Sequence, residues 1–373
     1  MANTFSNLVA NAYKGLDVVS RELVGFVNSV TLDADASAIP VGQTLYSFET
    51  PTTTISDITP AVTPPDDGDQ TIASKTISIT SQKRAPFRWT GEETAALNRG
   101  AGAMAIQAGQ VQQAIRTIVN QMEADVWAAA YVGASRAFGT AGTAPFASTL
   151  EAAAEARKIL DDNGADGARS LIINTTAGVK LRTLTQLTKA NEAGTAMTLR
   201  DGELLDMFGL SVKESAAVST VAAGTGSGYL INGALAVGAT TIVVDTGTGT
   251  VLAGNVVAIG NHKYVVATAL SGGSFTINKP GLKEAVADNA AVTLGATHTA
   301  NLAFSQSSIV LAARTPYVPE GDSAVNQEII SDPRSGISFR LAQYPNYYRS
   351  QYEISACWGQ TVIKPAHTAL VLG

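Results

Sequence analysis

Residues 103–131 read AMAIQAGQVQQAIRTIVNQMEADVWAAAY, and this stretch decides the fold. Its apolar residues recur mostly three, four or seven positions apart, which places them on one stripe of a single α-helix. At about 1.5 Å per residue the helix would extend roughly 43 Å, well beyond the ordinary helix of about 11 or 12 residues. The stretch therefore predicts a rigid rod. Its apolar stripe consists of Met104, Val111, Ile115, Ile118, Met122, Val126 and Ala129.

The segment before the rod changes from extended to helical character at Thr90. Residues 40–89 carry β-branched runs on either side of the turn-forming sequence PPDDGD, residues 64–69, which favours a long β-hairpin with little core of its own. Thr90 and Glu93 form a capping box, in which each side chain accepts a hydrogen bond from a backbone N–H at the helix start. We therefore expect a helix to begin at Thr90 and to be interrupted near residues 98–102.

The chain after the rod predicts further helices and strands. A helix is expected at residues 150–160, then a short buried strand at residues 171–173 and another helix, which together make a small α/β unit. Residues 222–299 alternate short strands with Gly and Asn turns and carry balanced charge, a pattern typical of a small inserted antiparallel β-barrel or sandwich. Residues 349–358 then alternate with period two, with Trp358 on the apolar face.

Composition limits the class of protein. The 373 residues are enough for two or three domains. Only 15% of them are charged, against about 25% in soluble globular proteins. Either partners cover much of the surface, or the chain is a secreted β-rich protein. The net charge of −6 argues against a protein that grips nucleic acid. Because Cys357 is the only cysteine, an intrachain disulfide and a zinc site of thiolates are excluded.

The N-terminal residues favour a cytoplasmic protein. Residues 1–13, MANTFSNLVANAY, lack the basic and apolar segments of a secretory signal, and no run approaches the roughly 18 apolar residues of a membrane span. Apolar residues between positions 5 and 30 recur near a helical period, which predicts an amphipathic N-terminal helix or arm.

The order of these pieces resembles the major capsid proteins of tailed bacteriophages, whose fold is usually called HK97-like. Residues 155–181, EARKILDDNGADGARSLIINTTAGVKL, are similar to that family's axial helix, turn and strand. Residues 199–215, LRDGELLDMFGLSVKES, are similar to its next loop and strand, with Gly202 and Gly209 at the turns. The C-terminal strands, with the aromatic-glycine step at Trp358, resemble the family's closing strands.

The resemblance implies an α+β, HK97-like fold and a division of the chain. The insertion is similar to an extra β domain found in one branch of short-tailed-phage coat proteins. The expected parts are 1–39, N-terminal arm; 40–89, extended hairpin loop; 90–149, peripheral domain with the spine helix; 150–221, axial domain; 222–299, inserted β domain; and 300–373, returning axial and peripheral strands.

The resemblance also implies a non-enzymatic structural function. Pentamers and hexamers of the chain would form an icosahedral head around double-stranded DNA, which the chain would contact non-specifically. A portal protein and a separate scaffolding protein are the expected partners, because the sequence shows no long helical leader. The expected location is the virion, assembled in the host bacterial cytoplasm without a membrane. The alternative is a secreted or surface β-rich adhesin, which the abundance of Gly, Thr and Ala favours.

Charged residues of the expected hairpin are the candidate contacts between subunits. As a solvated loop they would do little, since exposed ion pairs contribute only about 0–1 kcal/mol. In a shell the same charges recur at every contact, so even weak pairs select the neighbour and its register. We hypothesise that the loop reaches over a neighbouring subunit and meets opposite charges there. These residues are Asp66, Asp67, Asp69, Lys83, Arg84 and Arg88.

No motif predicts catalysis, a metal or a cofactor. Residues 224–228 read GTGSG but lack the Lys and the Ser or Thr of a phosphate loop, so a flexible junction is the better interpretation. His262, His298 and His367 have no neighbours at ligand spacing, and no nucleophile elbow occurs. The aromatic residues are either an interface cluster or, as large side chains favour, part of the core. They are Trp89, Trp127, Trp358, Tyr344, Tyr347, Tyr348 and Tyr352.

Overall fold

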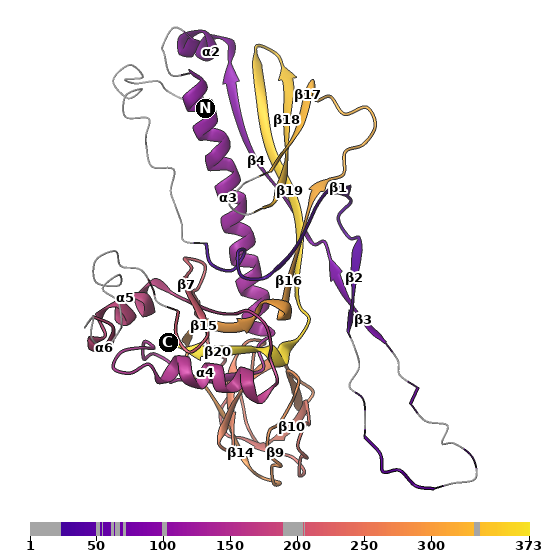
Figure 1. Cartoon of the computed structure of the whole chain (residues 1–373), viewed down its shortest axis with the longest axis vertical. Coiled ribbons are helices and arrows are strands. Elements are labelled where there is room, and N and C mark those ends of the chain that lie inside the picture. Colours follow the sequence, from indigo (N-terminus) through magenta and orange to yellow (C-terminus); the bar gives the residue numbers. More distant parts are fainter. Residues whose placement is uncertain are drawn as a thin grey trace.

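The computed structural model describes residues 24–49, 53, 55–60, 63, 68–69, 72–98, 103–188, 204, 206–331 and 336–373. The helix or arm predicted within residues 5–30 lies mostly outside this part of the chain. Figure 1 shows an elongated molecule, with a long helix beside a sheet at one end, a mixed layer of helices and strands in the middle and a barrel at the other end. A hairpin extends to one side of this body.

The long helix α3 spans Ala103–Val132, which confirms the predicted rod. The lower part of its apolar stripe, including Met122 and Val126, is fully buried against the neighbouring sheet. Figure 1 shows α3 running along this sheet for most of its length.

The capping box before the rod is also confirmed. The backbone N–H of Thr90 donates to Glu93 Oε2 (2.8 Å), and the backbone N–H of Glu93 donates to Thr90 Oγ1 (3.2 Å). These bonds satisfy two N–H groups that a helix start leaves without partners. They begin helix α2, Gly91–Asn98.

The sheet beside α3 joins segments from distant parts of the sequence. Its central strand is β19, which pairs with β4 along one edge and with β16 and then β18 along the other. Strand β1 runs parallel beside β16, and β17 lies antiparallel beside β18. The strands are β1 Thr31–Ile39, β4 Ser81–Thr90, β16 Ile309–Pro316, β17 Asn326–Ser331, β18 Ser338–Asn346 and β19 Arg349–Val362.

Strand β19 is buried on both faces, whereas the period-two pattern predicted one polar, outward face. Ile354 and Trp358 lie in the core with α3, as the pattern indicated. On the opposite face Cys357 packs in a second cluster with Ile77 and Ile79, so residues at the base of the hairpin cover that face. The alternation therefore assigns residues to faces correctly but does not reveal that both faces are covered.

The hairpin is shorter than the 40–89 range expected from the sequence. Strand β2, Thr44–Glu49, pairs antiparallel with β3, Ala73–Ser78. Strand β4 is not part of the hairpin: its residues Ser81–Thr90 pair with β19. Pairing with β19 buries Trp89, which is 5% exposed, and the hairpin has no comparable core to offer. The gain in apolar burial explains why β4 joins the sheet.

The middle layer contains the helix, strand and helix predicted after the rod. They are α4, β6 and α5, and their apolar side chains form a separate core with β20 and β15. Strand β6 lies between β15 and β7, and β20 and β5 continue the sheet beyond β15. The elements are β5 Arg136–Phe138, α4 Glu151–Asp162, β6 Arg169–Ile173, α5 Thr175–Thr183, α6 Thr185–Thr188, β7 Ser211–Glu214, β8 Thr220–Val221, β15 His298–Ser305 and β20 Thr368–Leu372.

The strands between β8 and β15 close into an antiparallel ring. Going round it, β11 pairs with β14, β14 with β9, β9 with β10, β10 with β13, β13 with β12, and β12 with β11 again. The ring has its own apolar core, which includes Tyr264 and Phe275, and β12 pairs with β5 of the middle layer. The strands are β9 Tyr229–Ile231, β10 Thr241–Asp245, β11 Val256–Ile259, β12 His262–Ser271, β13 Ser274–Ile277 and β14 Ala291–Leu294.

A buried carboxylate on α3 holds the first described residues against the body. Glu123 is 2% exposed. Its Oε1 accepts hydrogen bonds from the backbone N–H of Gly25 (2.5 Å) and Phe26 (2.7 Å) and from the hydroxyl of Ser215 (2.7 Å), and its Oε2 accepts one from the N–H of Val27 (2.9 Å). A buried charge is stable only when such donors replace water. One side chain therefore joins α3, the N-terminal segment and the residue after β7.

We predict that Glu123→Gln lowers the free energy of unfolding of the unassembled chain by about 2–4 kcal/mol. The amide NH₂ would face donors where a carboxylate oxygen now accepts, so at least one buried N–H would lose its acceptor. Urea denaturation measures the change. Glu328→Gln on the exposed edge strand β17 makes the same charge change and should stay within about 0.5 kcal/mol of the parent. Equal effects of the two substitutions would contradict the assigned role of Glu123.

Candidate assembly surfaces

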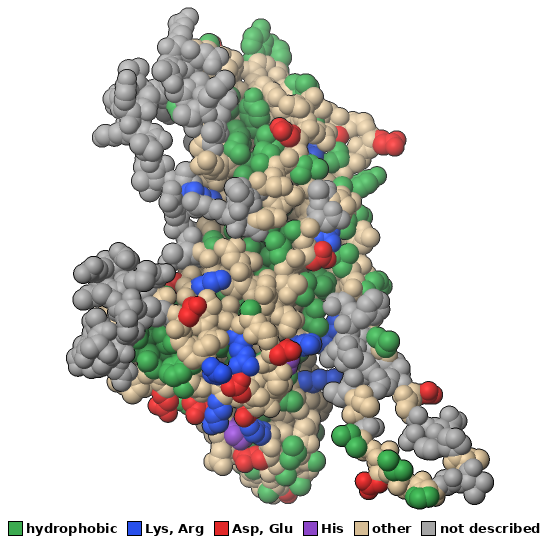
Figure 2. All heavy atoms as spheres, viewed as in Figure 1, with side chains coloured by type: hydrophobic (Ala, Val, Ile, Leu, Met, Phe, Trp, Pro, Cys, Tyr) green, Lys and Arg blue, Asp and Glu red, His purple; other side chains and the backbone are tan. Residues whose placement is uncertain are grey.

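The loop of the hairpin carries isoleucines that no described part of the chain covers. Ile55 and Ile58 are 100% exposed, and Ile72 is 66% exposed. Figure 1 shows the hairpin and its loop extending away from the body, and Figure 2 shows apolar side chains along the described part of the loop. Large apolar side chains gathered on a projecting segment are typical of a surface that another molecule covers.

The candidate charged contacts do not lie together on the hairpin. Asp69 is exposed in the loop, whereas Asp66 and Asp67 lie outside the described residues. Lys83, Arg84 and Arg88 are exposed on β4, which belongs to the sheet beside α3. The structure thus separates the basic positions from Asp69, because β4 pairs with β19 and not with the hairpin.

Arg84 already has a carboxylate partner within the chain. Its Nη1 lies 2.8 Å from Glu353 Oε2, and the Arg84 side chain is 61% exposed while that of Glu353 is 11% exposed. The hydrogen bond with Glu353, together with its negative charge, raises the pKa of Arg84. Arg84 therefore compensates a nearly buried carboxylate. The sequence pattern did not indicate this pair, because Arg84 and Glu353 lie 269 positions apart along the chain.

Lys83 and Arg84 line a groove of about 410 Å³ on the outer face of the sheet. The loop between β16 and β17 forms its other wall. Arg340 Nη2 (2.8 Å) and the hydroxyl of Tyr344 (3.2 Å) donate hydrogen bonds to Asp322 Oδ2, which fixes this loop on β18. The groove is therefore a firm surface with an exposed lysine at its margin.

The aromatic residues separate into core and surface groups. Trp358 is fully buried, and Trp89 is 5% exposed, so the core interpretation holds for both. Tyr347 and Tyr348, in the turn between β18 and β19, are 83% and 79% exposed, and their rings lie edge to face at 4.7 Å. Exposed tyrosines are enriched in protein interfaces. This turn is a second projecting apolar surface at the far end of the body (Figure 1).

Within the described residues, no group of three or more His, Cys, Asp and Glu side chains is arranged to hold a metal ion. Burial lowers the pKa values of His262, His298 and His367. None of the described helices combines the length and apolar character needed to cross a membrane.

We predict that Arg84→Gln lowers the free energy of unfolding by about 1 kcal/mol, because Glu353 loses its cationic partner in a largely buried position while Arg84 itself is half in solvent. The matched substitution Lys83→Gln, one position earlier on the same strand, should change it by less than about 0.5 kcal/mol. Urea denaturation of the two variants distinguishes an internal ion pair from general surface charge. A larger loss for Lys83→Gln than for Arg84→Gln would refute the pairing.

Comparisons with known proteins find the fold but no sequence relative. No family model matches the chain, and no curated protein matches its sequence. The capsid structure of the cyanophage P-SCSP1u is similar, with a TM-score of 0.53 and 14% identity over 100% of this chain and 92% of that one. The mature capsid of bacteriophage PhiM1 is similar at a TM-score of 0.50 and 12% identity, covering 100% of this chain and 91% of that one. A structure of Mycobacterium phage Che8 gives a TM-score of 0.50 and 12% identity, over 100% and 96%. The chain therefore shares its fold, along its whole length, with chains from phage particles.

Proposed function

We propose that this chain is the major capsid protein of a tailed phage, an HK97-like subunit that assembles with copies of itself into an icosahedral head. The observation that carries the proposal is the whole-length likeness to phage capsid structures. The projecting hairpin and its exposed isoleucines support the proposal, because large apolar side chains exposed on a projecting segment are typical of a contact surface. On this proposal the function is structural, and the chain is found in the virion.

Apolar contacts from the hairpin supply most of the contact energy between subunits. Burying one large aliphatic side chain contributes about 1.5–3 kcal/mol, whereas an exposed ion pair contributes about 0–1 kcal/mol. Ile55 and Ile58 therefore outweigh Asp69 or Lys83 in affinity. The charges select the neighbour and its register, as proposed for Asp66, Asp67, Asp69, Lys83 and Arg88, while Arg84 acts mainly within its own subunit.

The barrel is a domain inserted into the axial domain. Its support is that the chain leaves and re-enters the middle layer at adjacent positions, since β8 pairs with the start of β15 through Val221 and His298. The barrel strands between them have a core of their own. Residues 150–221 and the strands β15 and β20 then make up the axial domain, and the other strands of 300–373 return to the sheet beside α3.

Further partners follow from the same proposal. Pentamers and hexamers of this chain enclose double-stranded DNA, which the weakly acidic subunit, with a net charge of −6, contacts without sequence specificity. A separate scaffolding protein directs assembly in the host cytoplasm, and a portal protein occupies one vertex. The adhesin alternative has no counterpart among the solved structures described above.

We predict that the full chain forms shells, rods or sheets visible by negative-stain microscopy, alone or with its scaffolding protein, and that Ile55→Ser with Ile58→Ser abolishes them. Urea denaturation should show the monomer stability unchanged, because both side chains are already in solvent. Asp57→Asn in the same loop is the matched control and should leave assembly largely intact. A parent chain that stays monomeric at high concentration with its scaffolding protein would sink the proposed function.

We predict that Lys83→Glu slows assembly and that the defect is largest at low ionic strength, because salt screens exposed charges over a Debye length of about 10 Å at 0.1 M. Light scattering at two salt concentrations measures the assembly rate. Lys364→Gln, which removes an exposed lysine elsewhere, should have a smaller effect. A Lys83→Glu rate that matches the parent at low salt would rule out an electrostatic contact at this position.

A further inference from the structure

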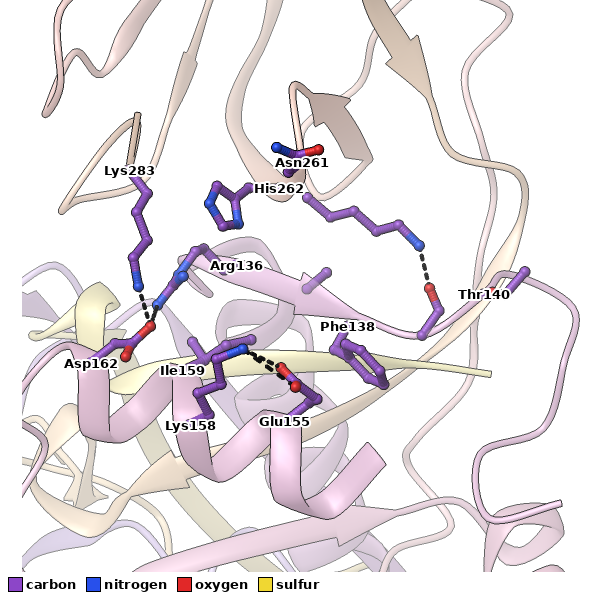
Figure 3. Close-up of a pocket in the computed structure, with 13 residues that line it drawn as sticks. Arg136, Phe138, Thr140, Glu155, Lys158, Ile159, Asp162, Asn261, His262 and Lys283 are labelled. Atoms are coloured by element: carbon purple, nitrogen blue, oxygen red, sulfur yellow. Dashed lines mark hydrogen bonds and ion pairs between the residues drawn. The ribbon is translucent and has the colours of Figure 1, made fainter. Parts of the chain in front are cut away.

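A cavity of about 380 Å³ lies where the barrel meets the middle layer. Strand β5 supplies Arg136 to its wall, and helix α4 supplies Lys158. Strand β12 supplies Lys263, and the barrel loop after β13 supplies Lys283. Figure 3 shows Arg136 and Lys283 pointing toward Asp162 and Lys158 lying beside Glu155, in the space between α4 and the barrel. The cavity is thus built by the fold and not by one flexible loop.

The lining carries more positive than negative charge. Besides the four cations, the cavity wall contains two carboxylates, Glu155 and Asp162. The nearby Glu284 is engaged on the barrel side, where its Oε1 accepts the backbone N–H of Asn261 (3.0 Å). Figure 2 shows blue and red side chains side by side over this lower part of the body. A surplus of two positive charges is notable in a chain whose net charge is −6.

Contacts within the chain hold the four cations in place but do not use all of their N–H donors. Asp162 Oδ2 accepts hydrogen bonds from Arg136 Nη2 (3.1 Å) and from Lys283, and this pairing lowers the pKa of Asp162 (Figure 3). Lys158 Nζ reaches Glu155 (3.2 Å), and Lys263 Nζ donates to the carbonyl of Gly139. Each ammonium group has three N–H donors, so these contacts leave several of them available.

Arg136 is the strongest indication that a ligand belongs here. It is 6% exposed, and its Nε has no acceptor among the described residues. A buried N–H without an acceptor costs about 1–3 kcal/mol. Burial lowers the pKa of the neighbouring His262; the negative charge of Glu284 opposes this shift, and the positive charges of Arg136, Lys283 and Lys158 add to it. The cavity therefore favours an incoming anion with several acceptor oxygens.

We propose that this cavity binds a phosphate-class oxyanion. A dianion matches the surplus of two charges, and its oxygens can accept hydrogen bonds from the planar guanidinium of Arg136 and from the remaining N–H donors of Lys158 and Lys263. Because these donors come from the middle layer and from the barrel, the bound anion joins the two across their junction. This inference concerns the single chain and does not rest on the proposed function.

The test uses the unassembled full chain and inorganic phosphate. The midpoint temperature of thermal unfolding should be about 2–4 °C higher in saturating phosphate than in sodium chloride at the same ionic strength. Calorimetric titration should give a Kd that Lys158→Gln and Lys263→Gln each weaken about tenfold. Two variants are used so that a folding defect in one leaves the other informative.

Lys180→Gln is the matched control, because it removes an exposed lysine on α5, the helix after β6, and Lys180 does not line this cavity. Its phosphate affinity should equal that of the parent. The proposal is overturned if phosphate and chloride give the same unfolding temperature, or if all three lysine substitutions weaken phosphate binding equally, which would indicate diffuse attraction to the surface.

Discussion

Two carboxylates on α3 fix this helix against segments from distant parts of the sequence. Glu123 accepts the backbone N–H groups of Gly25, Phe26 and Val27, and two residues later Asp125 Oδ2 accepts the indole N–H of Trp358 (2.8 Å). One helix thereby fixes the N-terminal segment and the central strand β19 within hydrogen-bond distance of itself. Apolar burial alone is non-directional and would tolerate sliding along the helix. The carboxylates remove that freedom, because each misplaced donor would leave a buried group unpaired.

The segments that project from the body differ from its core in burial. The hairpin loop with Ile55 and the turn with Tyr347 project from a body whose helix and sheets are fixed by buried contacts. On the proposed function, neighbours in a closed shell meet at slightly different angles, so a subunit needs contact surfaces that adapt while its core does not. Exposed apolar residues such as Ile55 and Tyr347 lie on the projecting segments, whereas the buried carboxylate of Glu123 lies on α3.

Local sequence signals predicted individual helices and strands, but they did not predict which strands pair across long stretches of the chain. The rod from Ala103 and the Thr90–Glu93 capping box depend on residues a few positions apart, so the sequence displays them directly. The pairing of β4 with β19 depends on a partner more than 250 positions away, and it moved Lys83 and its basic neighbours from the hairpin to the sheet. Glu123 was visible as one of the few charges in α3, but the N–H groups it accepts come from a segment that the sequence pattern did not bring near it.

The cavity between α4 and the barrel could not be predicted from local sequence signals either. Its cations lie at positions 136, 158, 263 and 283, each unremarkable in its own stretch, and none is near a motif. Only the pairing of β5 with β12, through Lys263 opposite Ala137 and Tyr264 opposite Arg136, brings the barrel lysines over α4. That pairing also explains why the cavity keeps a surplus of charge: Asp162 can neutralise Arg136 and Lys283 only in part, since a single carboxylate faces two cations. The barrel and the middle layer are joined by the pairing of β5 with β12, and beside this pairing lies the cluster with surplus positive charge. An anion that binds this cluster stabilises the junction, because it binds only the folded chain.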